Sequence, residues 1–219
     1  MLKSRLCIAF FAFAVGCAPA QKPLTDYVNP MLGTATLWDS VDLGFKPTKR
    51  TWGAEVFPGS SLPNAMVQVS PVTKFHSGAG YQYEDSVIYG FTHTNKGHWN
   101  LCHIPLLPVT GTPTPGDYCS PFSHERESAA PGYYQVFLDR YGVDAQLSST
   151  LRCAFHKYTY PAGAAPAVLA DLQRSNEHVR AWDIRKEGDN VFAGWQQTGE
   201  KMYFYAVANL SLIHISEPT

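Results

Sequence analysis

The densest group of chemically active side chains lies in one short stretch between Gly90 and His103. The stretch holds three histidines, one cysteine, two asparagines and one tryptophan: His93, Asn95, His98, Trp99, Asn100, Cys102 and His103. Imidazole and thiolate groups are zinc ligands, whereas an aromatic ring beside neutral donors and acceptors is typical of a sugar subsite. Two kinds of site therefore have to be weighed.

The spacing counts against zinc. His93 and His98 are five residues apart, which places them on one face of neither a helix nor a strand, and the chain has no HExxH or CxxC motif. As a sugar subsite, Trp99 would stack on the ring while His93, Thr94, His98 and Asn100 bond hydroxyl groups. A structural alternative stays open, in which Trp99 is a core aromatic and the histidines satisfy backbone groups in a turn.

Carboxylates are the second group to consider, because glycoside cleavage normally uses two of them. The candidates are Glu55, Glu84, Asp85, Asp117, Glu125, Glu127, Asp171 and Glu177. No pair is recognisable by spacing, so we predict no catalytic residue and interpret each as a solvated or turn carboxylate. The run Ser123-His124-Glu125 lacks a G-x-S-x-G elbow, and neighbours on a strand point to opposite faces, so it is excluded as a nucleophile–base pair.

Strands must position these groups, because no segment keeps a 3.6-residue apolar period for three turns. Ten strand-like runs stand between turn signals: 65–70, 86–92, 104–109, 133–138, 143–150, 154–160, 167–172, 179–184, 190–196 and 202–208. Short strands about ten residues apart indicate a mostly β protein, a sandwich or a barrel. Residues 29–63 are rich in Gly and Pro and predict a long loop.

Composition agrees with this fold class and excludes one class of partner. Seventeen Lys and Arg against 18 Asp and Glu give a formal charge of −1, which argues against a nucleic-acid-binding protein. Charged residues make up 16% and aromatics 13%, with 17 Gly and 16 Pro. Few charges and many turn-formers favour strands and loops over a helical bundle.

The first twenty residues predict a signal peptide. Lys3 and Arg5 precede the apolar run 6–16, and Ala18-Pro19-Ala20 is a cleavage site before Gln21. The run is shorter than the roughly 20 residues of a membrane-spanning helix. As an alternative, residues 14–17 are similar to a bacterial lipobox, with Cys17 lipidated. Either route predicts an exported protein, in the periplasm, on the bacterial cell surface or secreted, with membrane contact only through a lipid anchor.

Cys102, Cys119 and Cys153 remain after the leader, an odd number. A disulfide between two of them stays open, and we expect buried, unpaired thiols. At the other end, residues 210–219 follow a strand with a fresh apolar run and no turn, and LIHISEPT resembles translated adapter sequence. We therefore expect one domain over residues 21–209 and a non-native tail over 210–219.

Several ordered motifs resemble one enzyme family. They are DYVNPMLGT (26–34), FPG (57–59), LPNAMVQVSP (62–71), GYQY (80–83), IYGFTHT (88–94), SPFSHE (120–125), ESAAPGYY (127–134) and RCAFHKYTYP (152–161). Together they are similar to glycoside hydrolase family 92, the calcium-dependent exo-α-mannosidases. The similarity covers residues 26 to 208 without a break.

The resemblance implies an N-terminal antiparallel β-sandwich that is followed, in full-length members, by an (α/α)₆ barrel absent from this chain. It places the catalytic acid and base and most calcium ligands in that barrel, so this chain would be an inactive fragment that contacts the barrel and a mannose-containing glycan. The form HTNKGHWN resembles members that trim α-1,2-linked mannose, and carries over Trp99 as a substrate-binding residue. His93, Thr94, His98 and Asn100 are expected beside it. The alternative is a stand-alone carbohydrate-binding β-sandwich.

Overall fold

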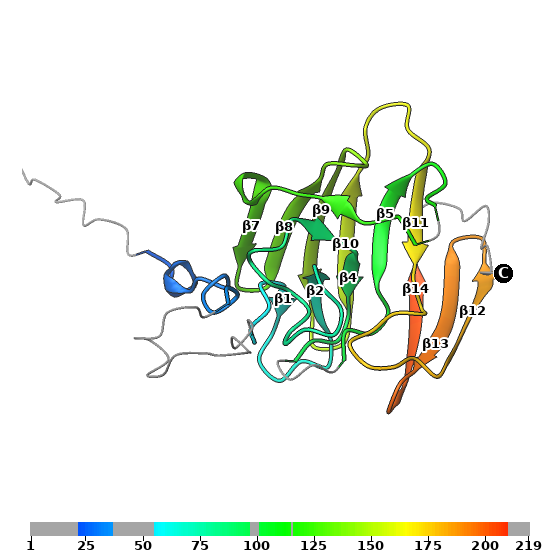
Figure 1. Ribbon diagram of the computed structural model, residues 1–219, viewed down its shortest axis with the longest axis horizontal. Helices are drawn as coiled ribbons and strands as arrows, with labels where there is room; N and C mark the ends of the chain where they lie inside the picture. The colour runs from blue at the N-terminus through cyan, green and yellow to red at the C-terminus, as the bar shows by residue number, and fades with distance from the viewer. Residues whose placement is uncertain (1–21, 37–54, 97–100, 115, 210–219) are drawn as a thin grey trace, which may run out of the picture.

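The computed structural model describes residues 22–36, 55–96, 101–114 and 116–209, and within them the chain is almost entirely strands and loops. The described ranges hold two short 3₁₀ helices, η1 (Leu24–Tyr27) before the strands and η2 (His124–Arg126) between β6 (Ser120–Pro121) and β7 (Glu127–Ala130). No helix in these described ranges is long and apolar enough to cross a membrane. The sheets are antiparallel throughout, as Figure 1 shows.

Two sheets form a sandwich. The first has the order β1-β2-β4-β5-β11, made of β1 (Ser60–Ser61), β2 (Gln68–Val72), β4 (Gly90–Thr92), β5 (Leu106–Thr110) and β11 (Pro166–Ala170). The second has the order β10-β9-β8-β7, made of β7 (Glu127–Ala130), β8 (Tyr133–Leu138), β9 (Val143–Ser149) and β10 (Ala154–Thr159). The antiparallel β-sandwich expected from the resemblance is confirmed.

The period-two pattern of the second sheet builds the core between the layers. In β8 the alternate residues Tyr134, Val136 and Leu138 are fully buried. In β9 the inward positions are Val143, Ala145 and Leu147, and they meet Val69, Phe91 and Leu107 of the first sheet in one apolar cluster. Each buried aliphatic or aromatic side chain stabilises the fold by about 1.5–3 kcal/mol. The alternation visible in the sequence therefore corresponds to the core.

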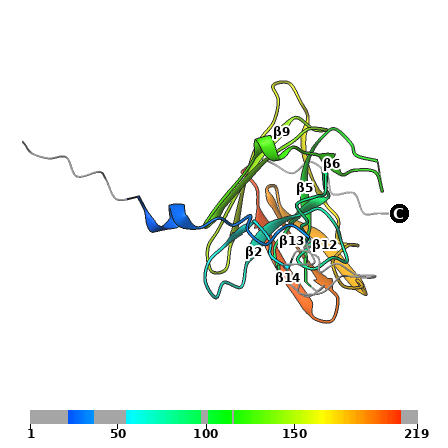
Figure 2. The same ribbon diagram turned by 60° about the vertical axis from the view of Figure 1, so that its left-hand side comes forward.

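A third sheet, β12-β13-β14, lies beside the sandwich and is seen from two sides in Figures 1 and 2. It consists of β12 (Ala181–Gly188), β13 (Val191–Gln197) and β14 (Lys201–Val207), with β12 and β13 joined at Asp189 and Asn190. One row on β14 is largely exposed: Tyr203, Tyr205 and Val207 are 64–70% accessible. The buried Gln196 of β13 holds the sheet against the neighbouring loops.

Three sequence predictions need correction. The predicted strand 86–92 is two strands, because the chain leaves β3 (Val87–Ile88), which pairs with β6 (Ser120–Pro121), and enters β4 in another sheet. The strand β7 was missed, since its sequence ESAA carries no β-branched or aromatic residue. The other nine predicted runs each overlap an observed strand; β12, for example, runs four residues past the predicted end at residue 184.

The third correction concerns the thiols. All three described cysteines are unpaired, as expected, but only Cys102 is buried. Cys119 is half-buried, and Cys153 is exposed because it sits in the turn between β9 and β10. The predicted leader with Cys17, the tail and part of the predicted 29–63 loop lie outside the described residues.

Candidate functional site

The predicted polar stretch connects β4 to β5, and its two described ends lie side by side. We call residues 93–96 its first arm and residues 101–105 its second arm. The backbone N–H of His93 donates to the carbonyl of His103 over 3.0 Å, and Cys102 N–H donates to the carbonyl of Thr94 over 2.7 Å. The two arms therefore form the closed base of a loop.

Asn95 fastens the first arm to β2. This side chain is only 2% exposed. Its Nδ2 donates to the Gln68 carbonyl over 2.6 Å, and its backbone N–H donates to Gln68 Oε1 over 3.1 Å. The Thr92 hydroxyl donates to Asn95 Oδ1 over 3.2 Å. A buried amide keeps its place only when its donors and acceptors are paired, so this arm is fixed.

Gln196 fastens the second arm from the third sheet. It is completely buried, and its Oε1 accepts from the Ile104 N–H over 2.8 Å. Its Nε2 donates to the carbonyls of Leu172 and Arg174, both over 2.9 Å. One side chain thereby joins the loop base to the segment that leads into β12.

A line of polar groups runs under the loop base from Thr94 to Glu177. His103 N–H donates to Thr94 Oγ1 over 3.0 Å, so the Thr94 hydroxyl proton is available for His103 Nδ1, 2.8 Å away. His103 Nδ1 therefore accepts from the Thr94 hydroxyl. His103 Nε2 carries the ring proton and donates to the Thr198 hydroxyl over 2.9 Å. Burial lowers the pKa of His103 although the nearby Glu177 opposes the shift, so the imidazole is neutral at pH 7.

Glu177 ends this line as a carboxylate. Burial raises its pKa, but hydrogen bonds from the Thr198 hydroxyl and from the backbone N–H groups of Gly199 and Leu101 outweigh burial and bring the pKa below its usual value. Leu101 N–H lies 3.3 Å from Oε1 and Gly199 N–H lies 3.2 Å from Oε2. Glu177 thus holds the start of the second arm.

The second arm also carries backbone strain. Leu101, Cys102 and Ile104 have φ angles of 64°, 58° and 56°, in the left-handed region that bulky L-residues rarely adopt. Such conformations cost on the order of 1–3 kcal/mol each and persist only where the surroundings fix them. The bonds from Gln196 and Glu177 supply that fixation, and strain of this kind is concentrated at functional loops.

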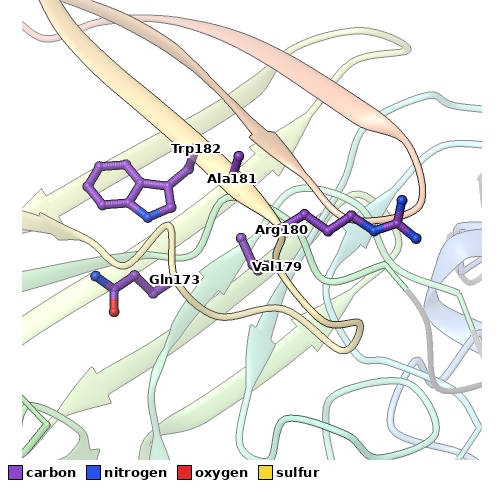
Figure 3. A pocket seen from close by; sticks show the side chains of 5 residues that line it. All are labelled: Gln173, Val179, Arg180, Ala181 and Trp182. Carbon is purple, nitrogen blue, oxygen red and sulfur yellow. The ribbon is translucent and has the colours of Figure 1, made fainter.

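An open depression of about 450 Å³ lies on the segment that Gln196 holds. Its lining residues are Gln173, Val179, Arg180, Ala181 and Trp182. Figure 3 shows the Trp182 ring and the Gln173 amide on one side of this depression, with Arg180 extending away from both. An indole beside an amide can contact a sugar ring, but the depression is wide open to solvent.

Two of the five predicted substrate-binding residues lie in the described part of the chain. His93 and Thr94 stand together at the loop base, and each bonds within the protein: His93 Nδ1 lies 2.7 Å from the Ile104 carbonyl, and Thr94 is 7% exposed. His93 thus bonds a backbone carbonyl, and Thr94 bonds the side chain of His103. His98, Trp99 and Asn100 lie outside the described residues, and substrate contact stays a prediction for all five.

The interpretation of Glu127 as a solvated or turn carboxylate was wrong, because it lies in β7 and is buried. Its side chain is 2% exposed and bonds Tyr81, Tyr134 and His124. The sequence also missed Glu177 and Gln196 as supports of the loop. A glutamine at an inward position of the apolar run VFAGWQQ was the available signal for Gln196, because a buried amide in a strand must have partners.

Calcium, which the resemblance implies for full-length members, finds no fitting ligand set here. Within the described ranges no three His, Cys, Asp or Glu side chains come together in a way that could hold a metal ion.

Fold and loop together define a β-sandwich domain that presents one rigidly anchored polar loop. The family model of the glycosyl hydrolase family 92 N-terminal domain matches residues 27–214, so the chain belongs to this family of glycoside hydrolases. The match overlaps the first residues of the predicted non-native tail, whose origin stays a prediction. A search among curated proteins found no match.

Solved structures agree. The chain is 27% identical to the family GH92 α-mannosidase BT3965 from Bacteroides thetaiotaomicron, solved in complex with mannoimidazole, with a TM-score of 0.76 over 88% of this chain. It is 25% identical to the family GH92 inverting mannosidase BT2199 from Bacteroides thetaiotaomicron VPI-5482, with a TM-score of 0.64 over 82% of this chain. The chain spans about a quarter of these proteins, 26% and 24% of their lengths.

Proposed function

We propose that this chain is the N-terminal, substrate-pocket domain of an exported, inverting exo-α-mannosidase that removes α-1,2-linked mannose from N-glycans or mannan. The observation that carries the proposal is the family match over residues 27–214, combined with a polar loop whose base is fixed by buried hydrogen bonds. Mannosidase activity and inversion are described for relatives of this fold. The leader over residues 1–20 supports export.

In this proposal the chain binds and orients the sugar. Trp99 stacks on the sugar beyond the cleaved bond, while His98 and Asn100 bond hydroxyl groups and the arms around His93 and Thr94 keep the loop in place. The paired carboxylates and most calcium ligands belong to the part of a full-length enzyme outside this chain. A rigid loop costs little entropy on binding, which is why a strained and fully bonded base suits a substrate pocket.

The direct test is to recover the reading frame beyond codon 209, express the full-length enzyme and assay α-1,2-mannobiose with calcium present. We expect release of mannose with inverted anomeric configuration, read by NMR, and slower release from the α-1,3 and α-1,6 isomers. A genuine stop codon directly after residue 209 would contradict the proposal. Comparable rates on all three isomers would contradict the linkage.

A matched pair of variants tests the loop. Trp99→Ala should lower kcat/KM about tenfold, because an aromatic contact contributes about 0.5–1.5 kcal/mol and about 1.4 kcal/mol corresponds to a factor of ten. Trp99→Phe keeps an aromatic ring and should keep most of the kcat/KM. The 219-residue chain alone should release no mannose, and release would overturn its assignment as an inactive fragment. Tight binding of mannobiose by this chain in calorimetry would favour the stand-alone binding module.

A further inference from the structure

His156 lies on β10, in the sheet opposite the loop, and its ring meets that of His93. Opposite it on β9 stands the buried Leu147, so the inner face of β10 carries His156 into the sandwich. The two Nε2 atoms are 2.9 Å apart and the ring centroids 5.0 Å apart. On its other side, His156 Nδ1 is 2.7 Å from the Tyr158 hydroxyl. No sequence pattern pointed to this pair, which is separated by 63 residues.

The Ile104 carbonyl shows where each proton lies in this chain of hydrogen bonds. The Ile104 carbonyl only accepts, so His93 carries its proton on Nδ1, and neutral His93 then has a lone pair on Nε2. The proton between the two Nε2 atoms therefore belongs to His156. His156 Nδ1 is left to accept from the Tyr158 hydroxyl. The pattern assigns opposite tautomers to the two histidines.

The surroundings keep both rings neutral. The Phe91 ring meets His156 edge-on and is stacked beside the Tyr158 ring, with 25° between the two planes. Burial lowers the pKa of His93 to about 4, although the hydrogen bond to the Ile104 carbonyl opposes this shift. The pKa of His156 is well below its usual value, mainly because the ring is buried and to a smaller extent because His93 is near. At pH 7 both imidazoles are uncharged.

We propose that His156 is a positioning residue for the loop between β4 and β5. Its Nε2–H holds His93 in the tautomer that donates to the Ile104 carbonyl, and that bond ties the second arm of the loop to the first. The hydrogen-bond chain is a property of the described residues; only its consequence, a correctly shaped sugar subsite, rests on the proposed function.

The physical reason lies in the alternative tautomer. Without a donor at position 156, Nε2 of His93 loses its partner, and only the Ile104 carbonyl still favours the proton on Nδ1. A proton that moved to Nε2 would turn the Nδ1 lone pair toward the Ile104 carbonyl oxygen at 2.7 Å. Two acceptors facing each other repel, and Ile104 already has a strained φ of 56°. The second arm would then relax away from His93.

The test begins with the wild-type 219-residue chain, labelled with ¹⁵N-histidine, by NMR at pH 7. We expect His93 protonated on Nδ1, His156 protonated on Nε2, and a scalar coupling between the two Nε2 nuclei through the hydrogen bond. His93 protonated on Nε2, or either ring doubly protonated, would overturn the proposal. This measurement requires no variant to fold and no sugar to bind.

The second measurement is amide hydrogen exchange in variants. His156→Phe should speed exchange of the His93 and Cys102 amides, which close the loop base, about fivefold, while the β8–β9 amides stay unchanged. His156→Gln restores a side-chain N–H donor and should return exchange close to wild type. The control His178→Phe changes an exposed histidine and should alter neither set of amides.

The positioning role would be overturned if the loop-base amides exchanged at the same rate in wild type and in His156→Phe. It would also be overturned if His156→Phe accelerated exchange of the β8–β9 amides as much as that of the loop-base amides. Failure of the proposed function would look different. The tautomers and exchange rates would remain as expected, and the full-length enzyme would simply not release mannose.

Discussion

Glu127 gives the sharpest prediction about stability. It is a carboxylate inside the protein, with a side chain 2% exposed. Tyr81 donates to its two oxygens over 2.9 and 3.0 Å, Tyr134 donates over 2.5 Å, and His124 Nδ1 lies 2.5 Å away. These donors come from the 81–83 segment, from β8 and from η2, so a single carboxylate joins three parts of the sandwich.

The perturbation is Glu127→Gln, which keeps the shape and removes the charge. His124 also donates from Nε2 to the Tyr83 carbonyl over 2.7 Å, so both ring nitrogens face acceptor oxygens. The amide retains one acceptor oxygen and turns an NH₂ toward the remaining donors. Losing two charge-assisted bonds at about 1.5 kcal/mol each gives a loss of about 3 kcal/mol in the free energy of unfolding.

The assay is urea denaturation followed by far-UV circular dichroism, with the midpoint and slope fitted for each variant. The matched control is Glu125→Gln, which removes the same charge two residues away on an exposed side chain and should change stability by less than about 0.5 kcal/mol. Tyr134→Phe, alone and combined with Glu127→Gln, measures the coupling across the 2.5 Å bond. If Glu127→Gln and Glu125→Gln were equally stable, the reasoning about this cluster would be refuted.

Three further predictions concern acid, thiols and the loop base. Burial lowers the pKa of His93 from 6.5 to about 4 and that of His156 well below 6.5. As the pH falls from about 6.5 to about 4, the unfolded chain therefore binds protons that the folded chain does not. The free energy of unfolding should then decrease by roughly 1.4 kcal/mol per pH unit for each such histidine. Denaturation midpoints across this range check it; His156→Phe should flatten the slope, and a parallel slope would contradict the assignment. Burial raises the pKa of the Cys102 thiol to about 12, whereas Cys153 is exposed. A water-soluble thiol reagent should therefore label Cys153 quickly and Cys102 only on unfolding. Cys153→Ser should remove this fast phase of labelling. Gln196→Leu should lower the free energy of unfolding by about 3 kcal/mol, because three backbone groups lose their hydrogen-bond partner. The control is Gln173→Leu, which changes an exposed glutamine. Equal denaturation midpoints for the two variants would contradict the role of Gln196.

Much of the sandwich could be predicted because its signal is local. The runs YYQVFL and VDAQLSS alternate inward and outward residues, and β8 and β9 follow that alternation. The strand β7 has no such signal, and it forms because its neighbour β8 offers a partner along four residues. Pairing with an existing strand can override weak local preference.

The loop shows the opposite balance. His93 and Thr94 could be found from the sequence because polar and aromatic residues are concentrated around them. The supports of the loop could not, because Gln196 bonds Ile104 from 92 residues away and His156 bonds His93 from 63 residues away. These residues are neighbours only in the folded protein. The histidines of the stretch could be counted in advance, but what each one bonds depends on the packing of the sheets.

The distance in sequence between Ile104 and Gln196 also sets an order of events during synthesis. A ribosome that adds 5–20 residues per second needs roughly 5 to 20 s to make the 92 residues between them. During that time β8, β9 and β10 can pair with one another, since their partners are neighbours in the chain. The second arm of the loop, with its left-handed Leu101, Cys102 and Ile104, can form its hydrogen bond to Gln196 only after β13 has been made. The set of bonds that holds the loop base is thus complete only once β13 has joined the domain.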